Sequence, residues 1–279
     1  MRPMARKPAA ELARRMMTIL ERGEYEVGGR TVSIAHELDR AVEDTREIDP
    51  DTRIAPVEPG ARSTRIEVTR ETTLDAARRL HGEGLSPCAL NFASARNPGG
   101  GFLNGARAQE ESLARSSGLY ACLSHRRMYT HHRERHDPLY SHWIIYSPAV
   151  PVVSDDDGTL LDPFYPCSFL TSPACNAGVA RERGGHAQRG GVRRVVEETM
   201  RERVARVLGV AAEEGERALV LGAWGCGVFG NEPAMVADLF GEALEGAFAG
   251  VFERVVFAVL DWSPEGRFVG PFEERFRQA

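Results

Sequence analysis

Two glycine-rich loops in the sequence contain the residue types that hold a phosphate-bearing ligand. The first, residues 91–101, leads from a strand-like segment into Gly99, Gly100 and Gly101. Three consecutive glycines let the backbone turn sharply, and no Cβ keeps a ligand from the amide N–H groups. The second, residues 222–231, leads into an expected helix, whose N-terminus favours an anion. Each loop alone is compatible with an ordinary surface turn, but two of them at the carboxyl ends of strands indicate a phosphate site.

A pair of glutamates follows the glycine triplet. After seven intervening residues come Gln109, Glu110 and Glu111. Carboxylates are common in the first turn of a helix as partners of its dipole, but next to a diphosphate loop they repel the ligand. A glutamate beside a glycosidic or ester bond acts as a general acid or base. Neighbouring helix positions differ by about 100°, so only one of the two faces such a bond, and the apolar pattern of this helix does not decide which.

Alternating strand and helix signals place these loops in an α/β sandwich with a mostly parallel or mixed sheet. The glycine loops follow two of the strands. Short apolar runs predict strands at 66–69, 89–95, 143–146, 168–170, 218–221 and 255–260. Apolar residues at helical spacing predict helices at 73–80, 109–123, 192–207 and 233–248.

The first 62 residues differ from the rest and predict an accessory layer on a main domain at 63–279. An amphipathic helix is expected at 9–22, ended by Gly23. A hairpin with a glycine turn, a short helix at 35–45 and a proline-rich joint at 49–63 follow it.

Composition narrows the class of protein. Of the 279 residues, 42% are hydrophobic and 27% charged, which is typical of a globular chain. A net charge of −5 argues against general coating of nucleic acid, so phosphate recognition must be local. The five cysteines are scattered without a C-x-x-C pair, which argues against a disulfide framework or a zinc ribbon. No apolar run approaches the length of a membrane span. We therefore expect a soluble, reduced, cytoplasmic protein.

The glycine triplet, seven residues and then Gln109-Glu110-Glu111 resemble the GGG-x(6–8)-QEE signature of the poly(ADP-ribose) glycohydrolases. Residues 91–95 and 225–231 are similar to the compact bacterial branch of that family, and the resemblance extends over essentially the whole chain. It implies a macrodomain-type three-layer α/β/α sandwich with a mixed central sheet, an N-terminal accessory extension and a cleft for ADP-ribose.

On this resemblance Glu111 is the catalytic acid/base and Glu110 holds a ribose hydroxyl. Asn97 binds the ribose beside the scissile bond, residues 225–230 wrap the diphosphate, and Phe229 packs on the ribose. The residues that contact adenine have no transferable motif, and 69–73 is only a positional expectation. The ligand-binding residues that we expect are Asn97, Gly99, Gly100, Gly101, Gln109, Gly225, Gly227, Val228, Phe229, Gly230 and Asn231.

The activity implied is hydrolysis of ribose–ribose O-glycosidic bonds in poly(ADP-ribose), with release of ADP-ribose and without a metal or organic cofactor. The implied partners are poly(ADP-ribose), ADP-ribose and ADP-ribosylated proteins, with no membrane and no sequence-specific nucleic acid. A role in the DNA damage response follows from the same resemblance. Two alternatives stay open: a hydrolase that removes single ADP-ribose groups from protein or nucleic acid, and a macrodomain that binds ADP-ribose without cutting it.

Two other features of the sequence contain residue types that bind metals or act as nucleophiles. Five histidines between 125 and 142 alternate with arginines, and His132 and His136 have the spacing of a metal pair on a helix. Without a third ligand in the pattern, a solvated basic stripe is the preferred interpretation, with a landing site for a polyanion as the alternative. Cys226 lies in the second loop, but no base neighbours it in the sequence, which argues against a cysteine nucleophile.

Overall fold

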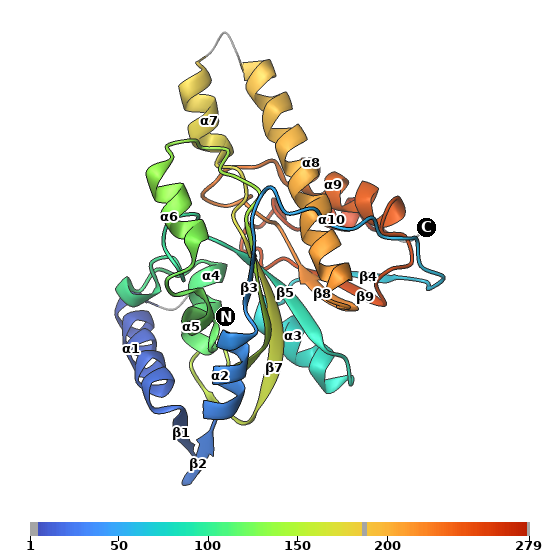
Figure 1. Ribbon diagram of the computed structural model, residues 1–279. Helices are drawn as coiled ribbons and strands as arrows, with labels where there is room; N and C mark the ends of the chain where they lie inside the picture. The colour runs from blue at the N-terminus through green and yellow to red at the C-terminus, as the bar shows by residue number, and fades with distance from the viewer. Residues whose placement is uncertain (1–4, 186–188, 278–279) are drawn as a thin grey trace.

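A seven-stranded mixed sheet lies between two layers of helices in the computed structural model, which describes residues 5–185 and 189–277 (Figure 1). The strand order is β3-β6-β7-β5-β8-β9-β4. Antiparallel pairing joins β3 to β6 and β6 to β7, and the five strands from β7 to β4 run parallel. The strands are β3 (Arg46–Ile48), β4 (Arg65–Thr69), β5 (Pro87–Phe92), β6 (Ile144–Ser154), β7 (Leu160–Ser172), β8 (Ala218–Leu221) and β9 (Arg254–Ala258).

Both faces of the sheet are buried, because side chains alternate between two hydrophobic cores. Leu219 and Leu221 face one core and Val220 faces the other. The first core includes α7 (Ala177–Gly184), α8 (Arg189–Glu213), α9 (Pro233–Glu245) and α10 (Gly270–Arg275). The second includes α2 (Ala35–Glu43), α3 (Thr73–Gly82), α4 (Gln109–Ser116), α5 (Leu119–Leu123) and α6 (Arg127–Glu134). The expected three-layer arrangement is therefore present.

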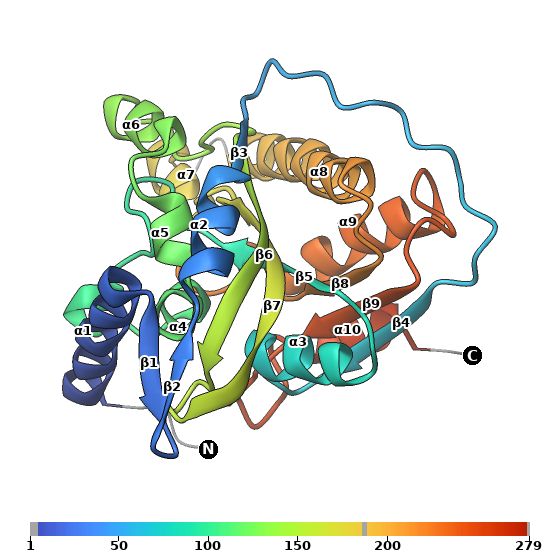
Figure 2. The same ribbon diagram turned by 60° about the horizontal axis from the view of Figure 1, so that its bottom comes forward.

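The N-terminal elements form a further layer beside the long β6–β7 pair (Figure 2). They are α1 (Arg6–Arg22), β1 (Glu24–Val27) and β2 (Arg30–Ser33). As predicted, Gly23 ends α1 in the left-handed conformation, with φ of 68°. The hairpin turn has φ of 57° at Gly28 and 74° at Gly29, which suits glycine in both places. The strand β3 follows α2 and pairs with β6, so residues 46–48 are part of the main sheet.

The single helix predicted over 109–123 is wrong. Ser117 has an extended backbone, with φ of −146° and ψ of 172°, and it forms a β-bridge with Val152. The amide of Gly118 donates to the carbonyl of Pro151 at 2.9 Å. These contacts with β6 split the segment into α4 and α5. The split leaves both glutamates in the first turn of a short eight-residue helix.

Several elements differ from the pattern-based expectation. The strands β6 and β7 extend to 11 and 13 residues, and β5 ends at Phe92 rather than at Ala95. The elements β3, α6, α7 and α10 were not predicted. These are short, and α6 has only three buried residues among polar ones. A segment of that kind carries too little periodicity to be recognised.

Candidate active site

The two glycine loops lie together at the carboxyl edge of the parallel strands. The first glycine loop (residues 91–101) begins at the end of β5, and the second glycine loop (residues 222–231) directly follows β8. These strands are neighbours in the sheet and run parallel. Chain segments after β4 and β9 reach the same edge, because those strands run in the same direction. This is where open α/β sheets bind ligands.

Glu111 lies beneath the first glycine loop. One carboxylate oxygen, Oε1, accepts a hydrogen bond of 3.0 Å from the amide of Gly101. The other oxygen, Oε2, is buried and has no partner among the described residues. The side chain is only 9% exposed. A buried acceptor without a partner is costly, which singles out Oε2 of Glu111 among the carboxylate oxygens of the two glutamates.

Gly100 leaves the space that this carboxylate occupies. Its φ is +61°, and a Cβ built on it would stand 2.3 Å from Oε1 of Glu111 and 3.0 Å from Oε2 of Glu110. Glycine is therefore required twice, by the left-handed backbone and by the contact. Gly99 has a φ of +66° and packs on Phe102. The triplet thus brings both glutamates against loop backbone.

Glu110 is turned into the protein. Its Oε2 accepts from the amide of Ser94 at 2.7 Å, and its Oε1 accepts from Nδ2 of Asn91 at 3.5 Å. Burial raises the pKa of the Glu110 carboxyl well above its usual range, and the hydrogen bond from Ser94 opposes that shift. Glu110 and Glu111 thus have different surroundings within one helical turn.

Gln109 ties the glutamate helix to its neighbours. Its Oε1 accepts from the amide of Phe92 at 2.9 Å, and its Nε2 donates to the carbonyl of Leu90 at 2.7 Å and to Oγ1 of Thr73 at 3.2 Å. These bonds fix the start of α4 to β5 and α3. The contacts of Gln109 thus position the two glutamates. Its expected role in ligand binding stays a prediction.

The second glycine loop is closed by Asn231. Its Nδ2 donates to the carbonyls of Cys175 at 2.8 Å and Gly225 at 3.1 Å, and its own amide also donates to Gly225. Gly225 has φ of +72°, and a Cβ there would stand 2.4 Å from the Cβ of Ala174. Asn231 is 3% exposed, so the structure places it as a closure of the loop.

The tip of the second loop is open to solvent. Val228 is 94% exposed and a Cβ on Gly227 would meet no atom within 4 Å. Phe229 is half-buried, and its ring lies 5.8 Å from the ring of Tyr140. Gly230 has φ of +66°, and its carbonyl accepts from Nη2 of Arg181 at 2.8 Å. Gly227 and Val228 are therefore free to meet a ligand.

Asn97 stands at the start of the glycine triplet and is exposed. Its amide donates to Oγ of Ser94 at 3.2 Å, and its carbonyl accepts from the amide of Gly100 at 2.9 Å. The turn formed by these bonds leads directly into the triplet above Glu111. The structure therefore brings the Asn97 turn, the triplet and Glu111 together, and the role of Asn97 in ribose binding stays a prediction.

A cavity of about 350 Å³ opens next to the glycine loops. Its lining includes residues 71–74 after β4, the start of α4 with Gln109 and Gly227 of the second loop. The end of β9 and the segment after it add residues 258–260 and Trp262. Trp262 belongs to this wall and is 55% exposed. Neither glutamate lines the cavity. Sequence reasoning missed the wall at 258–262, because nothing in that segment marks a ligand.

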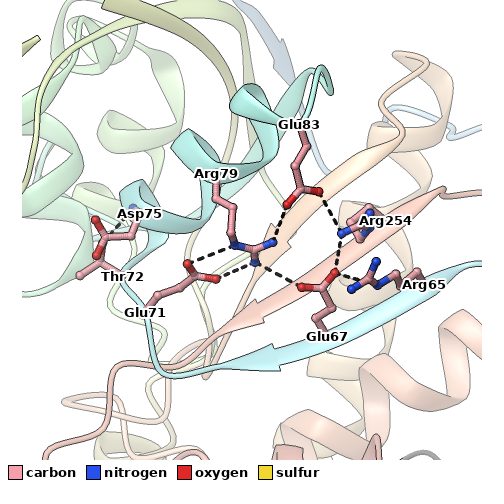
Figure 3. A network of polar contacts seen from close by, with 8 residues as sticks. All are labelled: Arg65, Glu67, Glu71, Thr72, Asp75, Arg79, Glu83 and Arg254. Carbon is pink, nitrogen blue, oxygen red and sulfur yellow. Dashed lines mark hydrogen bonds and ion pairs between the residues drawn. The ribbon is translucent and has the colours of Figure 1, made fainter.

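A network of ion pairs holds the wall formed by residues 71–74 (Figure 3). Arg79 of α3 contacts Glu71 at 2.7 Å, Glu67 at 3.3 Å and Glu83 at 3.2 Å. Thr72 caps α3 by accepting from the amide of Asp75 at 3.0 Å. The β4–α3 connection is thus fixed at both of its cavity residues, Glu71 and Thr72.

The histidine cluster is not a uniformly solvated stripe. His132 is 1% exposed, and Arg126 donates to the carbonyls of Cys122 at 2.7 Å and Val42 at 3.0 Å. Within residues 5–185 and 189–277, no group of three or more His, Cys, Asp or Glu side chains is placed to hold a metal.

Burial raises the pKa of the Cys226 thiol to about 12, which leaves it protonated near neutral pH.

We predict that folding stability declines as the pH falls from about 6.5 to about 4. Burial lowers the pKa values of both His132 and His142 to about 4, whereas unfolded histidine titrates near about 6.5. The unfolded chain therefore takes up protons first. The pKa of Glu110 is raised, so its protonation favours the folded state as the pH falls and opposes the effect of the histidines. The measurement therefore compares a histidine variant with the wild type. The unfolding free energy of His142→Gln should fall less steeply with acid than that of the wild type, and parallel slopes would contradict the prediction.

Comparison with known proteins identifies the family. The family description "Microbial-type PARG, catalytic domain" matches residues 13–155. The poly(ADP-ribose) glycohydrolase (PARG) of Thermomonospora curvata, crystallised with the inhibitor ADP-HPD, is 48% identical and has a TM-score of 0.89. The match covers 97% of this chain and 100% of that one. The chain belongs to the microbial-type PARG family.

Other comparisons agree with this family. A PARG from Deinococcus radiodurans in complex with ADP-ribose is 44% identical, with a TM-score of 0.79, over 90% of this chain and 98% of that one. No curated protein matches the chain. The family and its macrodomain-type fold were both predicted from the glycine triplet and the glutamate pair, and both are confirmed.

The part of the chain that the structure describes has no helix long and apolar enough to cross a membrane.

Proposed function

We propose that this protein hydrolyses ribose–ribose O-glycosidic bonds in poly(ADP-ribose) and releases ADP-ribose. The observation that carries the proposal is the environment of Glu111. One of its oxygens is held by the amide of Gly101, and the other is buried without a partner among the described residues. That arrangement suits a group that gives and takes a proton on one fixed oxygen. The complexes of relatives with ADP-ribose and with ADP-HPD support the ligand class.

In the proposed mechanism Glu111, protonated at Oε2, donates its proton to the oxygen that leaves with the neighbouring ribose. The C–O bond breaks as positive charge develops on the anomeric carbon, and the adjacent diphosphate stabilises that charge. The Glu111 carboxylate then takes a proton from water, whose oxygen bonds to the anomeric carbon. This step restores the acid. Most glycosidases divide these roles between two carboxylates, whereas here one glutamate performs both.

Glu110 is proposed to hold a ribose hydroxyl and to position the terminal unit. It stands beside Glu111 under Gly100, and its raised pKa favours the neutral carboxyl form. A neutral carboxyl both donates and accepts a hydrogen bond. It also avoids placing a negative charge next to the phosphates.

The diphosphate is proposed to lie against the second glycine loop, with Asn97 and the triplet on the terminal ribose. The amides of Gly227 and Val228 are on the open tip of that loop, and Phe229 stands next to it. The cavity is then the place for the adenosine end, since it contacts the same loop at Gly227 and the helix of the glutamates at Gln109. Its wall includes Glu71, Thr72 and Thr73, part of the segment expected from the sequence.

Trp262 is proposed to stack on the base. Its half-exposed ring stands in the cavity wall near Phe268, and base–aromatic stacking is worth about 1–3 kcal/mol. Trp262→Ala should weaken ADP-ribose binding by about tenfold in isothermal titration, since 1.4 kcal/mol corresponds to about tenfold. Val195→Ala, which removes an exposed apolar side chain on α8, should leave affinity unchanged. Equal affinities in all three proteins would rule out the stacking role.

Substrate preference separates this activity from a hydrolase of single ADP-ribose groups. Purified protein is incubated with poly(ADP-ribose) and, separately, with protein that carries one ADP-ribose per site. The proposal expects rapid shortening of the polymer, with the last protein-linked unit left in place. Faster release from the singly modified protein would favour the alternative activity. Stable polymer binding without shortening would assign the chain to the non-catalytic readers.

The proposed cellular setting of this chemistry is a reducing compartment. The five cysteines are all buried and unpaired, which suits a reducing compartment such as the cytoplasm. Turnover of poly(ADP-ribose) in the DNA damage response is the corresponding proposed role, with ADP-ribosylated proteins as partners. Residues 1–62 are proposed to act as an accessory region of the catalytic domain at 63–279, to whose sheet they contribute the edge strand β3.

A further inference from the structure

The last turn of α6 and the segment that leads from it to β6 join the two glycine loops, although they belong to neither loop. Three residues make the connection: His132 in the last turn of α6, and Tyr140 and Ser141 just before β6. All three lie more than 20 residues after the glutamate pair in the sequence. Their contacts reach the first loop at Ala95 and the second at Phe229.

The two ring nitrogens of His132 bond Ala95 of the first loop on one side and Ser141 on the other. The amide of Ser141 donates to Nε2 at 3.1 Å, and Oγ of Ser141 lies 2.7 Å from the same atom. Because Nε2 accepts, the ring proton is assigned to Nδ1, which lies 3.2 Å from the carbonyl of Ala95. A neutral histidine with this tautomer satisfies both partners. The ring is 1% exposed, so it is fixed by packing as well.

The first loop is bound to α6 by reciprocal bonds as well. Arg96 donates through Nε to the carbonyl of His132 at 3.2 Å and through Nη2 to the carbonyl of Arg135 at 3.4 Å. Arg133 in turn donates to the carbonyl of Arg96 at 2.8 Å. The last turn of α6 therefore moves with Ala95 and Arg96, the two residues before Asn97.

Tyr140 connects this unit to the second loop. Its φ is 56°, a left-handed conformation that is uncommon for a residue with a bulky side chain. The ring lies 5.5 Å from that of His132 and 5.8 Å from that of Phe229. The backbone beside it is held by the buried Arg203, whose Nη2 donates to the carbonyl of Leu139 at 2.9 Å. Strained backbone of this kind persists where the surroundings fix it.

We propose that His132 and Tyr140 form a strut that sets the separation of the two glycine loops, with His132 as a positioning residue for the hydrolysis proposed above. The strut contacts neither glutamate. It acts by keeping the Asn97 turn of the first loop at a fixed distance from Phe229 of the second. A ligand that spans both loops, with a ribose on one and a diphosphate on the other, requires that distance.

Two substitutions of His132 separate hydrogen bonding from packing. In His132→Gln the amide nitrogen replaces the donor to Ala95 and the amide oxygen replaces the acceptor for Ser141. In His132→Phe the ring remains but both bonds are lost. The strut predicts that the Phe variant loses about ten- to hundredfold in kcat, since a displacement of about 1 Å is enough for a loss of about 100-fold. The Gln variant should stay within about threefold of the wild type.

Equal activity in the two variants would overturn the proposal, because a residue that only fills space does not distinguish them. Thermal unfolding of each variant shows whether the Phe variant is folded at the assay temperature. If it is not, Tyr140→Asn decides the question, because asparagine tolerates the left-handed backbone while the ring between the loops is removed. The strut predicts a kcat loss of at least about tenfold there, and wild-type activity would contradict it.

ADP-ribose affinity gives a readout that does not depend on turnover. The strut predicts weaker ADP-ribose binding in His132→Phe and in Tyr140→Asn than in His132→Gln and the wild type, measured by isothermal titration. Unchanged affinity in every variant would contradict the strut even if polymer is hydrolysed. A wild-type protein that binds ADP-ribose but leaves polymer intact would contradict the hydrolysis alone, and the affinities would still test the strut.

Discussion

Glu111→Gln is expected to reduce hydrolysis of poly(ADP-ribose) by at least about 1,000-fold, in line with the loss of a general acid/base. Glutamine has nearly the same shape as glutamate, and its oxygen still accepts from the amide of Gly101, which bonds Oε1 of Glu111 at 3.0 Å. The amide cannot donate and retake a proton. Binding of ADP-ribose should therefore stay within a few-fold of the wild type. Chromatography of released ADP-ribose and titration of binding measure the two effects separately.

The neighbouring Glu110→Gln is the informative control. Burial raises the pKa of Glu110, so a neutral amide resembles the form that the site favours. Its oxygen also still accepts from the amide of Ser94, which lies 2.7 Å from Oε2 of Glu110. We expect Glu110→Gln to retain activity well above that of Glu111→Gln. If the two variants lose activity in the reverse order, the roles of the two glutamates must be exchanged.

Gly100→Ala is expected to lower kcat by about 100-fold or more while the protein stays folded. A Cβ at this position would stand 2.3 Å from Oε1 of Glu111, so the carboxylate has to move. Displacement breaks the bond from Gly101 and misplaces the acid, and a shift of about 1 Å is enough for this loss. The φ of +61° adds strain of about 1–2 kcal/mol for alanine. Steady-state kinetics and thermal unfolding are the measurements.

Gly84→Ala isolates the backbone strain from the contact. Gly84 has a φ of +85°, and a Cβ there would meet no atom within 4 Å. This variant should lose stability to a similar extent but keep full activity, because it lies outside the site. Equal kinetic losses in Gly84→Ala and Gly100→Ala would mean that general destabilisation, rather than the contact with Glu111, causes the effect.

That the two glycine loops lie at one edge of the sheet was predictable, because it follows from the parallel direction of the strands before them. Each glycine loop comes directly after a buried strand, and parallel strands bring their carboxyl ends to one edge. The choice between Glu110 and Glu111 did not follow, since both lie in one helical turn. It depends on the amide of Gly101, whose bond to Glu111 spans 10 residues of sequence. Only the folded chain shows that one glutamate oxygen is left without a partner among the described residues.

Other features depended on contacts that no local pattern encodes. The break after Ser116 exists because Ser117 pairs with Val152 of β6, and the three-residue strand β3 exists only through its pairing with the same strand. His132 was placed in a polar stripe, but its ring partners are 37 and 9 residues away. The cavity, of which the wall at 258–262 is one side, is likewise assembled from segments that are distant in sequence.

Hydrolysis of poly(ADP-ribose) by Glu111 is tested most directly by incubating the purified wild-type protein with the polymer, next to Glu111→Gln, and following free ADP-ribose by chromatography. We expect that ADP-ribose accumulates and the polymer shortens with the wild type only. Stable binding of polymer by the wild type with no release of ADP-ribose over hours would contradict it, and would make this chain a reader of ADP-ribose rather than an enzyme.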